Sequence, residues 1–573
     1  MDEGKRKIVP SNLITSFFPR ADKQQDNSAR NNESGCDVEQ GYVAMGRFVC
    51  AVEVSFPAVK DLTKILNPSF SFSYPELERS CLKVYREERA KVMQTMENLD
   101  GLIALSMDTL RRDTYDYHSY ELPEGRTVFD YLCVRAHFID DNWDPKSWVI
   151  YYVDVDDVYK NGTEKTILKC LSDLHIESKI STITPGDRIN YDDMIETLKD
   201  QLKEKKKLQI KCQPFQIHCC SDLLRQMVEA AFEEIEDIID RVSKHYPHWH
   251  VIFGNLQEAI ELQDKGKYLE QYGFELSDFP NEKEWEKLRY VGRLVKYIHN
   301  AAEILFFTKN PTASLYLHNL LELQASLRKE STSPDRLSIA TDLLQKFDEY
   351  WNDMFLVLAI STVMDPRCKM KYIEFSSLKN DDNSGNSKVT AVLEAIRGIY
   401  DDYRMQSLEA LNSSKHSESK PSESKPSDSK LSDSEPSDPD SEEELPSEEE
   451  DLPRGTLERL QKCNFGFNCI DEYNEFIKPS NRPPKSELEW YLDEPVLPWT
   501  KDFDLLSWWR TESPKYPILS KMARDLLAIQ LSVASSYDAF VYQDFRMADD
   551  SLDSLGPDLI NALACTRSYL KKD

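Results

Sequence analysis

The sequence lacks several features that would assign the protein to a common class. No apolar run approaches the roughly 18 residues that a membrane-spanning helix needs, and no apolar leader follows the basic residues Lys5–Lys7. The 12 cysteines are scattered along 573 residues, which fits a reducing compartment better than a disulfide framework. These absences predict a protein without a secretory leader, a membrane span or a disulfide scaffold.

Positive charge is also scarce. The chain has 71 Lys and Arg residues against 101 Asp and Glu residues, for a net charge of −30. Broad binding to the phosphate backbone of nucleic acids needs clustered Lys and Arg, so we expect at most weak DNA binding through a local patch. Residues 1–45 contain one cysteine, Cys36, and no histidine, so they cannot supply the four ligands of a tetrahedral zinc site.

Composition and periodicity divide the chain into six predicted segments. Polar residues dominate the start, and Ser-acid pentads with a strong acidic excess dominate a late insert, so neither part can bury a core. We predict a disordered tail at 1–42, a helical segment at 43–100, the first part of a sheet core at 101–245, a helical insertion at 246–405, a disordered acidic insert at 406–453 and a C-terminal region at 454–573 that completes the core.

The C-terminal region contains a helix with one apolar face. Apolar residues from Leu519 to Ile529 recur at i, i+3, i+4 and i+7 spacing, and Pro517 stands where a first helical turn tolerates proline. Trp508 and Trp509 add a second apolar cluster just before this helix. Two interpretations remain open: these residues form the core of their own chain, or they form an obligate interface.

Motifs in the same region resemble the C-terminal dimerisation region of plant hAT-superfamily transposases. They include Phe503-Asp504-Leu505-Leu506, Trp508-Trp509 and the run from Tyr516 to Asp525. The resemblance, which extends to proteins of the RICESLEEPER and DAYSLEEPER kind, implies a homodimer or a heterodimer with a related chain. The expected interface residues are Phe503, Leu506, Trp508, Trp509, Met522, Leu526 and Leu563.

Three strands are expected in the segment from 101 to 158. Ile103, Leu105 and Met107 alternate as in a strand, and apolar runs at 128–138 and 148–155 follow. This succession resembles the RNase H-like sheet of hAT transposases. The predicted fold class is therefore α/β: an RNase H-like core, interrupted by a large all-helical insertion, with a helical C-terminal dimerisation region.

Transposases of this family use three carboxylates to hold two divalent cations. Asp108 matches the first carboxylate, at the end of the first strand. Gly186 stands at the position of the second, and Ser536 stands where the third, a glutamate, belongs. We therefore predict no catalytic residues beyond the relic Asp108, no metal, no cofactor and no enzyme activity; the alternative is an active transposase that uses Asp108, Asp187 and Asp538.

Two further groups of residues suggest chemistry but have simpler interpretations. Cys219 and Cys220 are adjacent on an expected strand, where neighbouring side chains point to opposite faces, so no zinc site is predicted there. Asp365-Pro366-Arg367 matches the Asp-Pro-Arg motif of the family's helical domain. We interpret it as structural, with Pro366 ending a helix and the charges capping it.

The family resemblance predicts a nuclear protein. hAT members usually begin with a BED zinc finger, and residues 1–45 cannot form one. The expected function is that of a domesticated, catalytically inactive, dimeric interaction protein of the plant nucleus. An alternative is an acidic scaffold that recruits replication or chromatin factors through Phe17-Phe18 in the tail or through the acidic insert, whose serines suit acidophilic kinases.

Overall fold

The structure is a computed structural model of the whole chain. The residues that it describes are 33–52, 54–68, 71–112, 129–155, 162–186, 192–203, 215–242, 249–268, 279–308, 311–332, 338–379, 385–417, 485–500, 503–534, 552 and 555–571. Of the predicted disordered tail at 1–42 and the predicted disordered insert at 406–453, residues 1–32 and 418–453 lie outside these residues. Residues 33–42 and 406–417 are helical instead, within the helices Glu33–Ala51 and Gly385–Ser417.

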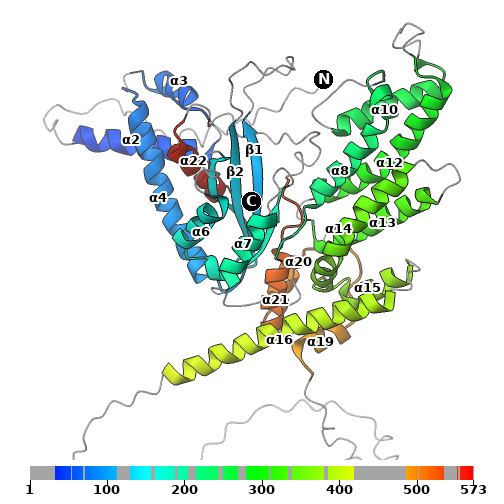
Figure 1. Cartoon of the computed structure of the whole chain (residues 1–573). Coiled ribbons are helices and arrows are strands. Elements are labelled where there is room, and N and C mark those ends of the chain that lie inside the picture. The colour runs from blue at the N-terminus through cyan, green and yellow to red at the C-terminus, as the bar shows by residue number, and fades with distance from the viewer. Residues whose placement is uncertain are drawn as a thin grey trace, which may run out of the picture. The chain divides into compact units, whose positions relative to one another are not determined.

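A mixed four-stranded sheet organises the first half of the chain (Figure 1). The strands are β1 (Ile103–Arg112), β2 (Phe129–Ile139), β3 (Pro145–Asp154) and β4 (Ile180–Pro185), in the order β3-β2-β1-β4. β1, β2 and β3 are antiparallel neighbours, and β4 runs parallel to β1. The predicted three-strand meander is confirmed.

Alternating side chains divide the sheet between two cores. Leu132 and Val134 of β2 face one core, together with helices α6 (Thr163–Asp173) and α7 (Asp192–Lys203). Tyr131 and Cys133 face the other core, with α2 (Glu33–Ala51), α3 (Phe56–Leu66) and α22 (Pro557–Leu570). The long helix α4 (Tyr74–Asn98) contributes to both cores. This arrangement follows from the two-residue period of a strand.

Both edges of the sheet are covered. Beyond β4, the backbone of Ile183 exchanges hydrogen bonds with Phe215 and Ile217, at 2.7 and 2.8 Å, which adds a short parallel fifth segment. Beyond β3, the N–H groups of Val149 and Tyr152 donate to Ser568 Oγ and Asn561 Oδ1 of α22, at 2.8 and 3.0 Å. Side chains of α22 therefore satisfy donors that an open edge strand would offer to another chain.

Helices make up the second part of the chain. α12 begins with a capping box, in which the Asn281 side chain accepts from the Glu284 N–H and Glu284 accepts from the Asn281 N–H. No helix of the described residues is both long and apolar enough to cross a bilayer. The helices are α8 (Cys220–Glu233), α9 (Glu236–Ile239), α10 (Trp249–Asp264), α12 (Glu282–Phe307), α13 (Ala313–Ser331), α14 (Ser338–Val363), α15 (Lys369–Lys379) and α16 (Gly385–Ser417).

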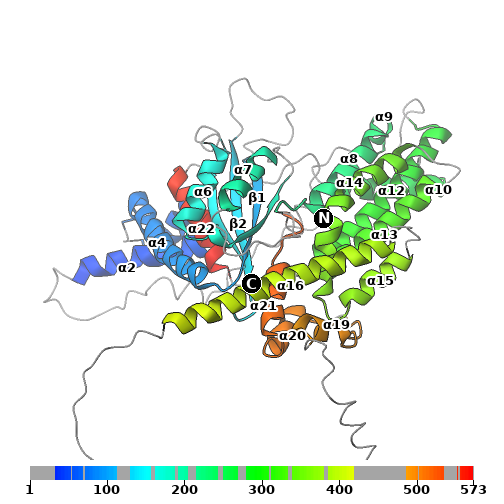
Figure 2. The ribbon, with the colours of Figure 1, turned by 60° about the horizontal axis from the view of Figure 1, so that its bottom comes forward.

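The C-terminal region is helical, as predicted. After α19 (Glu487–Asp493) come α20 (Leu505–Glu512) and α21 (Pro517–Leu527), and α21 lies against α16 in both views (Figure 2). Asp504 caps α20 by accepting the N–H groups of Leu506 and Ser507, and proline opens α21. The local sequence thus determines where both helices begin.

A buried carboxylate joins α21 to the start of the sheet and to α16. Asp525 Oδ1 accepts the Leu102 N–H at 2.9 Å, and Oδ2 accepts the Tyr403 hydroxyl at 2.6 Å. A Cβ atom at Gly101 would lie 2.9 Å from Asp525 Oδ1, so the turn before β1 needs glycine there. Burial raises the pKa of Asp525 to about 6, against the opposing effect of both hydrogen bonds.

The neighbouring residue Arg524 ties α21 to two turns of the sheet. Its Nη1 lies 2.5 Å from Asp141 Oδ1 in the β2–β3 turn, and its Nη2 donates to the Asp100 carbonyl oxygen at 2.5 Å. The Arg524 side chain is buried, whereas the carboxylate of Asp141 is exposed. These contacts explain why Arg524 and Asp525 are polar although they are buried on a helix with an apolar face.

Replacing Asp525 with asparagine should change how stability depends on pH. Between about pH 4 and pH 6 the folded protein holds more protons on Asp525 than the unfolded chain does, so the free energy of unfolding falls as the pH rises through this window. Relative to wild type, Asp525→Asn should gain about 1–3 kcal/mol when urea unfolding is repeated at about pH 7.5 instead of about pH 4.5.

Asp504→Asn provides the matched control, because hydrogen bonds led by that of Ser507 lower the pKa of Asp504. Its contribution to stability is lost only below the ordinary Asp pKa of about 4, so the stability difference between Asp504→Asn and wild type should stay nearly constant between about pH 4.5 and pH 7.5. If the stability difference between Asp525→Asn and wild type stayed constant across the window, the buried carboxylate would not titrate as described.

Candidate functional site

The register of β1 and β4 places the expected carboxylate positions side by side. Ser106 pairs with Thr184 in parallel register, and the Gly186 N–H donates to the Met107 carbonyl oxygen at 2.8 Å. Positions 108 and 186 therefore lie next to each other on the same face of the sheet. Asp108 is half-buried there, and its neighbour Gly186 has no side chain.

A serine and a histidine lie beside Asp108 on this face. Ser106 Oγ and His137 Nε2 are 2.8 Å apart, and both residues are buried. Burial, helped by the charge of Arg135, lowers the pKa of His137 to about 3. The imidazole is therefore neutral at physiological pH, and it fills the sheet face as a hydrogen-bonded core residue.

The segment after α21 crosses from the sheet to the helical part. Thr184 Oγ1 donates to the Gln530 carbonyl oxygen at 2.7 Å, and the Cys220 N–H donates to the Leu531 carbonyl oxygen at 2.8 Å. The Val533 N–H then donates to Cys219 Sγ at 3.2 Å. This segment passes β4, where Thr184 binds it. The expected position of the third carboxylate, 536, follows this segment in the sequence.

The remaining candidate carboxylates, Asp187 and Asp538, lie outside the described residues, as does Ser536. Across the parts of the chain that the structure describes, no three His, Cys, Asp or Glu residues gather as metal ligands. The strand expected at Cys219 and Cys220 is wrong. Cys219 is the N-cap of α8 and Cys220 is its first residue, so the pair stands at the start of a helix and not on a strand.

The Asp365-Pro366-Arg367 motif binds its own chain. The Arg367 guanidinium donates two hydrogen bonds to Asp365, at 2.9 and 2.6 Å, and Asp365 also accepts the Ser314 hydroxyl at 2.7 Å. The other faces of the guanidinium lie 4.1 Å from the ring centroid of Trp499 and 4.5 Å from that of Phe503. The motif is structural, as expected, but it clamps the C-terminal region in addition to ending a helix.

A second aromatic contact connects three parts of the chain. Trp509 stacks on Trp143 of the β2–β3 turn, with ring centroids 6.2 Å apart and planes 8° apart. Its Nε1 donates to the Met364 carbonyl oxygen at 2.8 Å, just after α14. Trp143 has a φ of 65°, which is unusual for a bulky residue, and the stack with Trp509 holds it in place.

The structure therefore distributes the seven expected interface residues between the core and the surface. Phe503, Leu506 and Trp508 are half-buried in the single chain. The other members are buried within their own chain, because α20, α21 and α22 pack against α14, β2, β3 and α4; they are Trp509, Met522, Leu526 and Leu563. These four residues belong to the core of the single chain. Of the seven expected interface residues, only Phe503, Leu506 and Trp508 offer surface to a partner.

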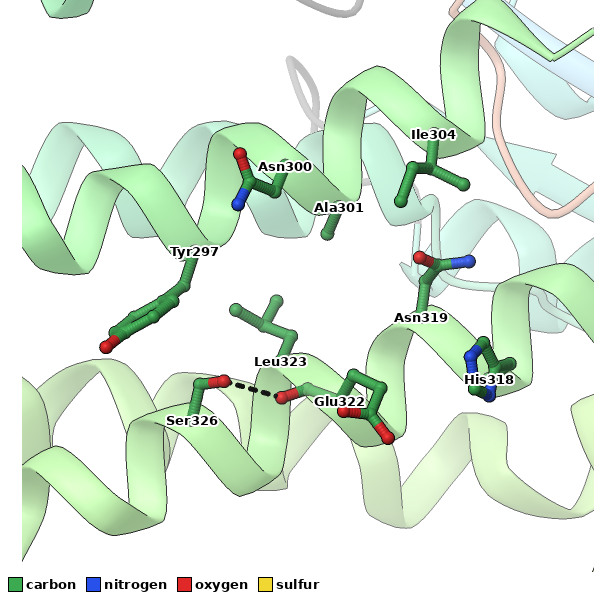
Figure 3. A pocket seen from close by; sticks show the side chains of 9 residues that line it. All are labelled: Tyr297, Asn300, Ala301, Ile304, His318, Asn319, Glu322, Leu323 and Ser326. Carbon is green, nitrogen blue, oxygen red and sulfur yellow. Dashed lines mark hydrogen bonds between the residues drawn. The ribbon is translucent and has the colours of Figure 1, made fainter.

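One further depression lies between α12 and α13 (Figure 3). It has a volume of about 500 Å³ and is open to solvent along one side. Glu322 is the one carboxylate among its lining residues, and the hydroxyl of Ser326 donates to the Glu322 carbonyl oxygen at 2.9 Å. The lining offers no paired acids and no nucleophile with an adjacent base, so it does not resemble a catalytic centre.

Sequence comparisons match three regions of this chain. The hAT family C-terminal dimerisation region matches residues 487–570. The profile described as "hAT-like transposase, RNase-H fold" matches residues 314–403, and the ZBED1 RNase-like domain matches residues 122–214. The chain carries hAT transposase domains. The family resemblance and the predicted α/β fold class are thereby confirmed.

The chain is similar to hAT-derived plant proteins and, over a short stretch, to an insect transposase. Zinc finger BED domain-containing protein RICESLEEPER 2 from Oryza sativa subsp. japonica is 27% identical over 558 residues, which cover 90% of this chain and 72% of the relative. DAYSLEEPER from Arabidopsis thaliana is 24% identical, over 97% of this chain and 78% of its own length. The Hobo transposase of Drosophila melanogaster is 34% identical over 80 residues, which are 12% of each chain.

The three matched regions correspond to different parts of the structure. The match at 122–214 covers β2, β3 and β4 of the sheet. The match at 314–403 covers α13, α14, α15 and most of α16, so in this hAT-type chain a profile named for the RNase-H fold falls on described helices. The dimerisation match at 487–570 covers α19–α22, whose helices hold the expected interface residues apart from Phe503, which precedes α20.

The substitution Trp509→Glu separates the core and interface interpretations. Because Trp509 is fully buried and hydrogen-bonded in its own chain, an unpaired carboxylate there should cost several kcal/mol and unfold the C-terminal region. Circular dichroism should show loss of helix and of cooperative melting. Trp490→Glu is the control, since Trp490 is 57% exposed and this variant should melt like wild type. A folded monomeric Trp509→Glu variant would contradict this prediction.

Proposed function

We propose that this chain is a domesticated hAT transposase-like protein that acts in the nucleus as a dimer without transposase activity. The observation that carries the proposal is the register of β1 and β4. Met107 pairs with Pro185 and accepts a hydrogen bond from the Gly186 N–H, so glycine is the residue that follows on the Asp108 side. The matched dimerisation region supports self-association, or association with a related hAT chain. The nuclear setting follows from the transposase-derived relatives.

The chemistry of phosphodiester transfer explains why Gly186 matters. Two divalent cations about 4 Å apart activate the nucleophile and stabilise the leaving oxygen, and bridging carboxylates must hold both ions. Mg²⁺ demands a near-octahedral shell of oxygen ligands, which one half-buried aspartate cannot supply. Glycine at 186 cannot supply the second metal-binding carboxylate, and we propose that Asp108 is a relic of the transposase site.

Metal binding tests this account. Titration with Mn²⁺, followed by calorimetry, should give no site tighter than about 1 mM in the wild-type protein, because one carboxylate binds a divalent cation weakly. Gly186→Asp should create a measurable site, since the register places the new side chain beside Asp108. The double variant with Asp108→Ala should lose it.

A nuclease assay completes the test. Wild-type protein should neither cut nor join DNA strands with Mg²⁺ or Mn²⁺. Metal-dependent cleavage that Asp108→Ala abolishes would instead favour the active transposase that uses Asp108, Asp187 and Asp538.

DNA binding is proposed to be weak. The net charge of −30 opposes association with a polyanion, and many of the described lysines and arginines are paired with carboxylates of the same chain. Such pairs weaken the positive potential that these side chains could offer to a duplex.

Titration with labelled duplex DNA at about 150 mM salt should therefore give a Kd on the order of 10⁻⁶ M or weaker. The Kd should rise further with salt and should differ little between sequences. Nanomolar affinity for one sequence over a scrambled duplex would show that this chain is a sequence-specific DNA-binding protein instead.

The combination of these properties suggests a role in mixed assemblies. This chain keeps the dimerisation region but has glycine at the position of the second catalytic carboxylate. If it paired with a related transposase that has all three carboxylates, one of the two catalytic sites in the dimer would be incomplete. We propose that partner choice, and not catalysis, is the property that the domesticated chain retains.

A further inference from the structure

An extended segment of the dimerisation region carries exposed apolar side chains. Between α19 and α20 the chain has no regular secondary structure over residues 494–500. Val496 is 42% exposed and Trp499 is 59% exposed, and Phe503 is half-buried beside them. Neighbouring exposed apolar side chains that form one patch are candidates for contact with a partner.

Several contacts hold this segment in one conformation. The Leu497 N–H donates to the Pro366 carbonyl oxygen at 3.0 Å, and Lys369 Nζ donates to the Glu494 carbonyl oxygen at 3.1 Å. The Arg367 guanidinium lies between the rings of Trp499 and Phe503. The aromatic side chains are therefore fixed before any partner arrives, which reduces the entropy cost of binding.

The cations beneath the segment are paired within the chain. Arg367 binds Asp365 in a bidentate pair, and Lys369 and Lys515 both lie against Glu494. The side chain of Arg367 is only 7% exposed and that of Lys369 is 3% exposed. A surface whose positive charges are already neutralised has little to offer a phosphate backbone, so its composition favours a protein partner.

We propose that Val496, Trp499 and Phe503 form the contact surface for a second copy of this chain. The inference rests on the proposed dimer and names the surface that makes it. The surface belongs to the matched dimerisation region, and it remains outside the core when Trp509, Met522 and Leu526 pack inside their own chain. Trp499 would be the central anchor, because aromatic side chains that are rigidly presented dominate interface energies.

The test measures dimer dissociation for full-length variants by analytical ultracentrifugation. Trp499→Ala should raise the dimer dissociation constant by at least about 30-fold, the effect of losing one aromatic anchor. Circular dichroism should show unchanged helix content, since Trp499 lies outside the core. Ile65→Ala on α3 is the control, since Ile65 is 76% exposed and lies outside the matched dimerisation region; its dissociation constant should equal that of wild type.

Val496→Glu is a second variant that leaves the Arg367 clamp intact. It places a charge on the proposed surface, and it keeps the test decisive if Trp499→Ala disturbs folding. A folded Val496→Glu monomer supports the surface. If both variants fold and dimerise with the wild-type dissociation constant, the proposed surface is wrong but the proposed dimer is not. The same holds if Ile65→Ala raises the dissociation constant as much as they do.

Two other outcomes are distinct. A wild-type protein that stays monomeric at tens of micromolar removes the proposed dimer and this surface together. If a single-stranded oligonucleotide quenches the fluorescence of wild type but not of Trp499→Ala, and both proteins have the same dimer dissociation constant, the surface binds nucleic acid and the proposal is wrong.

Discussion

The packing of Trp509 is the contact on which the arrangement of the chain depends. Its ring stacks on Trp143 from the sheet, and its indole N–H binds the Met364 carbonyl at the end of a helix in the helical part. Without that side chain, a strained turn and the end of α14 would both lose their partner. The C-terminal region is thus an internal connector before it is a surface for other molecules.

Neighbouring polar contacts fix the position of α21 against the sheet and α16. Asp525 reaches both the start of β1 and α16, and Arg524 reaches the β2–β3 turn. Buried polar groups are costly unless each finds a partner, so these contacts accept few alternative arrangements of α21. Apolar packing supplies most of the stabilisation, and the polar contacts select one position among those that packing alone would allow.

The same region divides its residues between two tasks. Residues that face inward complete the core, whereas Val496 and Trp499 remain exposed on a segment that Arg367 holds in place. The sheet meanwhile keeps the strand order that would bring two carboxylates together, with glycine at one of the positions. The scaffold and the proposed association surface thus persist although position 186 supplies no carboxylate.

The sequence by itself determined the local elements. Alternating residues predicted β1, and apolar runs predicted β2 and β3. Apolar periodicity and Pro517 predicted α21, and the motifs predicted the family. Only the tertiary structure decided which aromatic residues are core. Trp508 and Trp509 are adjacent and chemically alike, but successive helical side chains point about 100° apart. Trp509 is buried because Trp143 and Met364, both distant from it in the chain, meet on its side of α20.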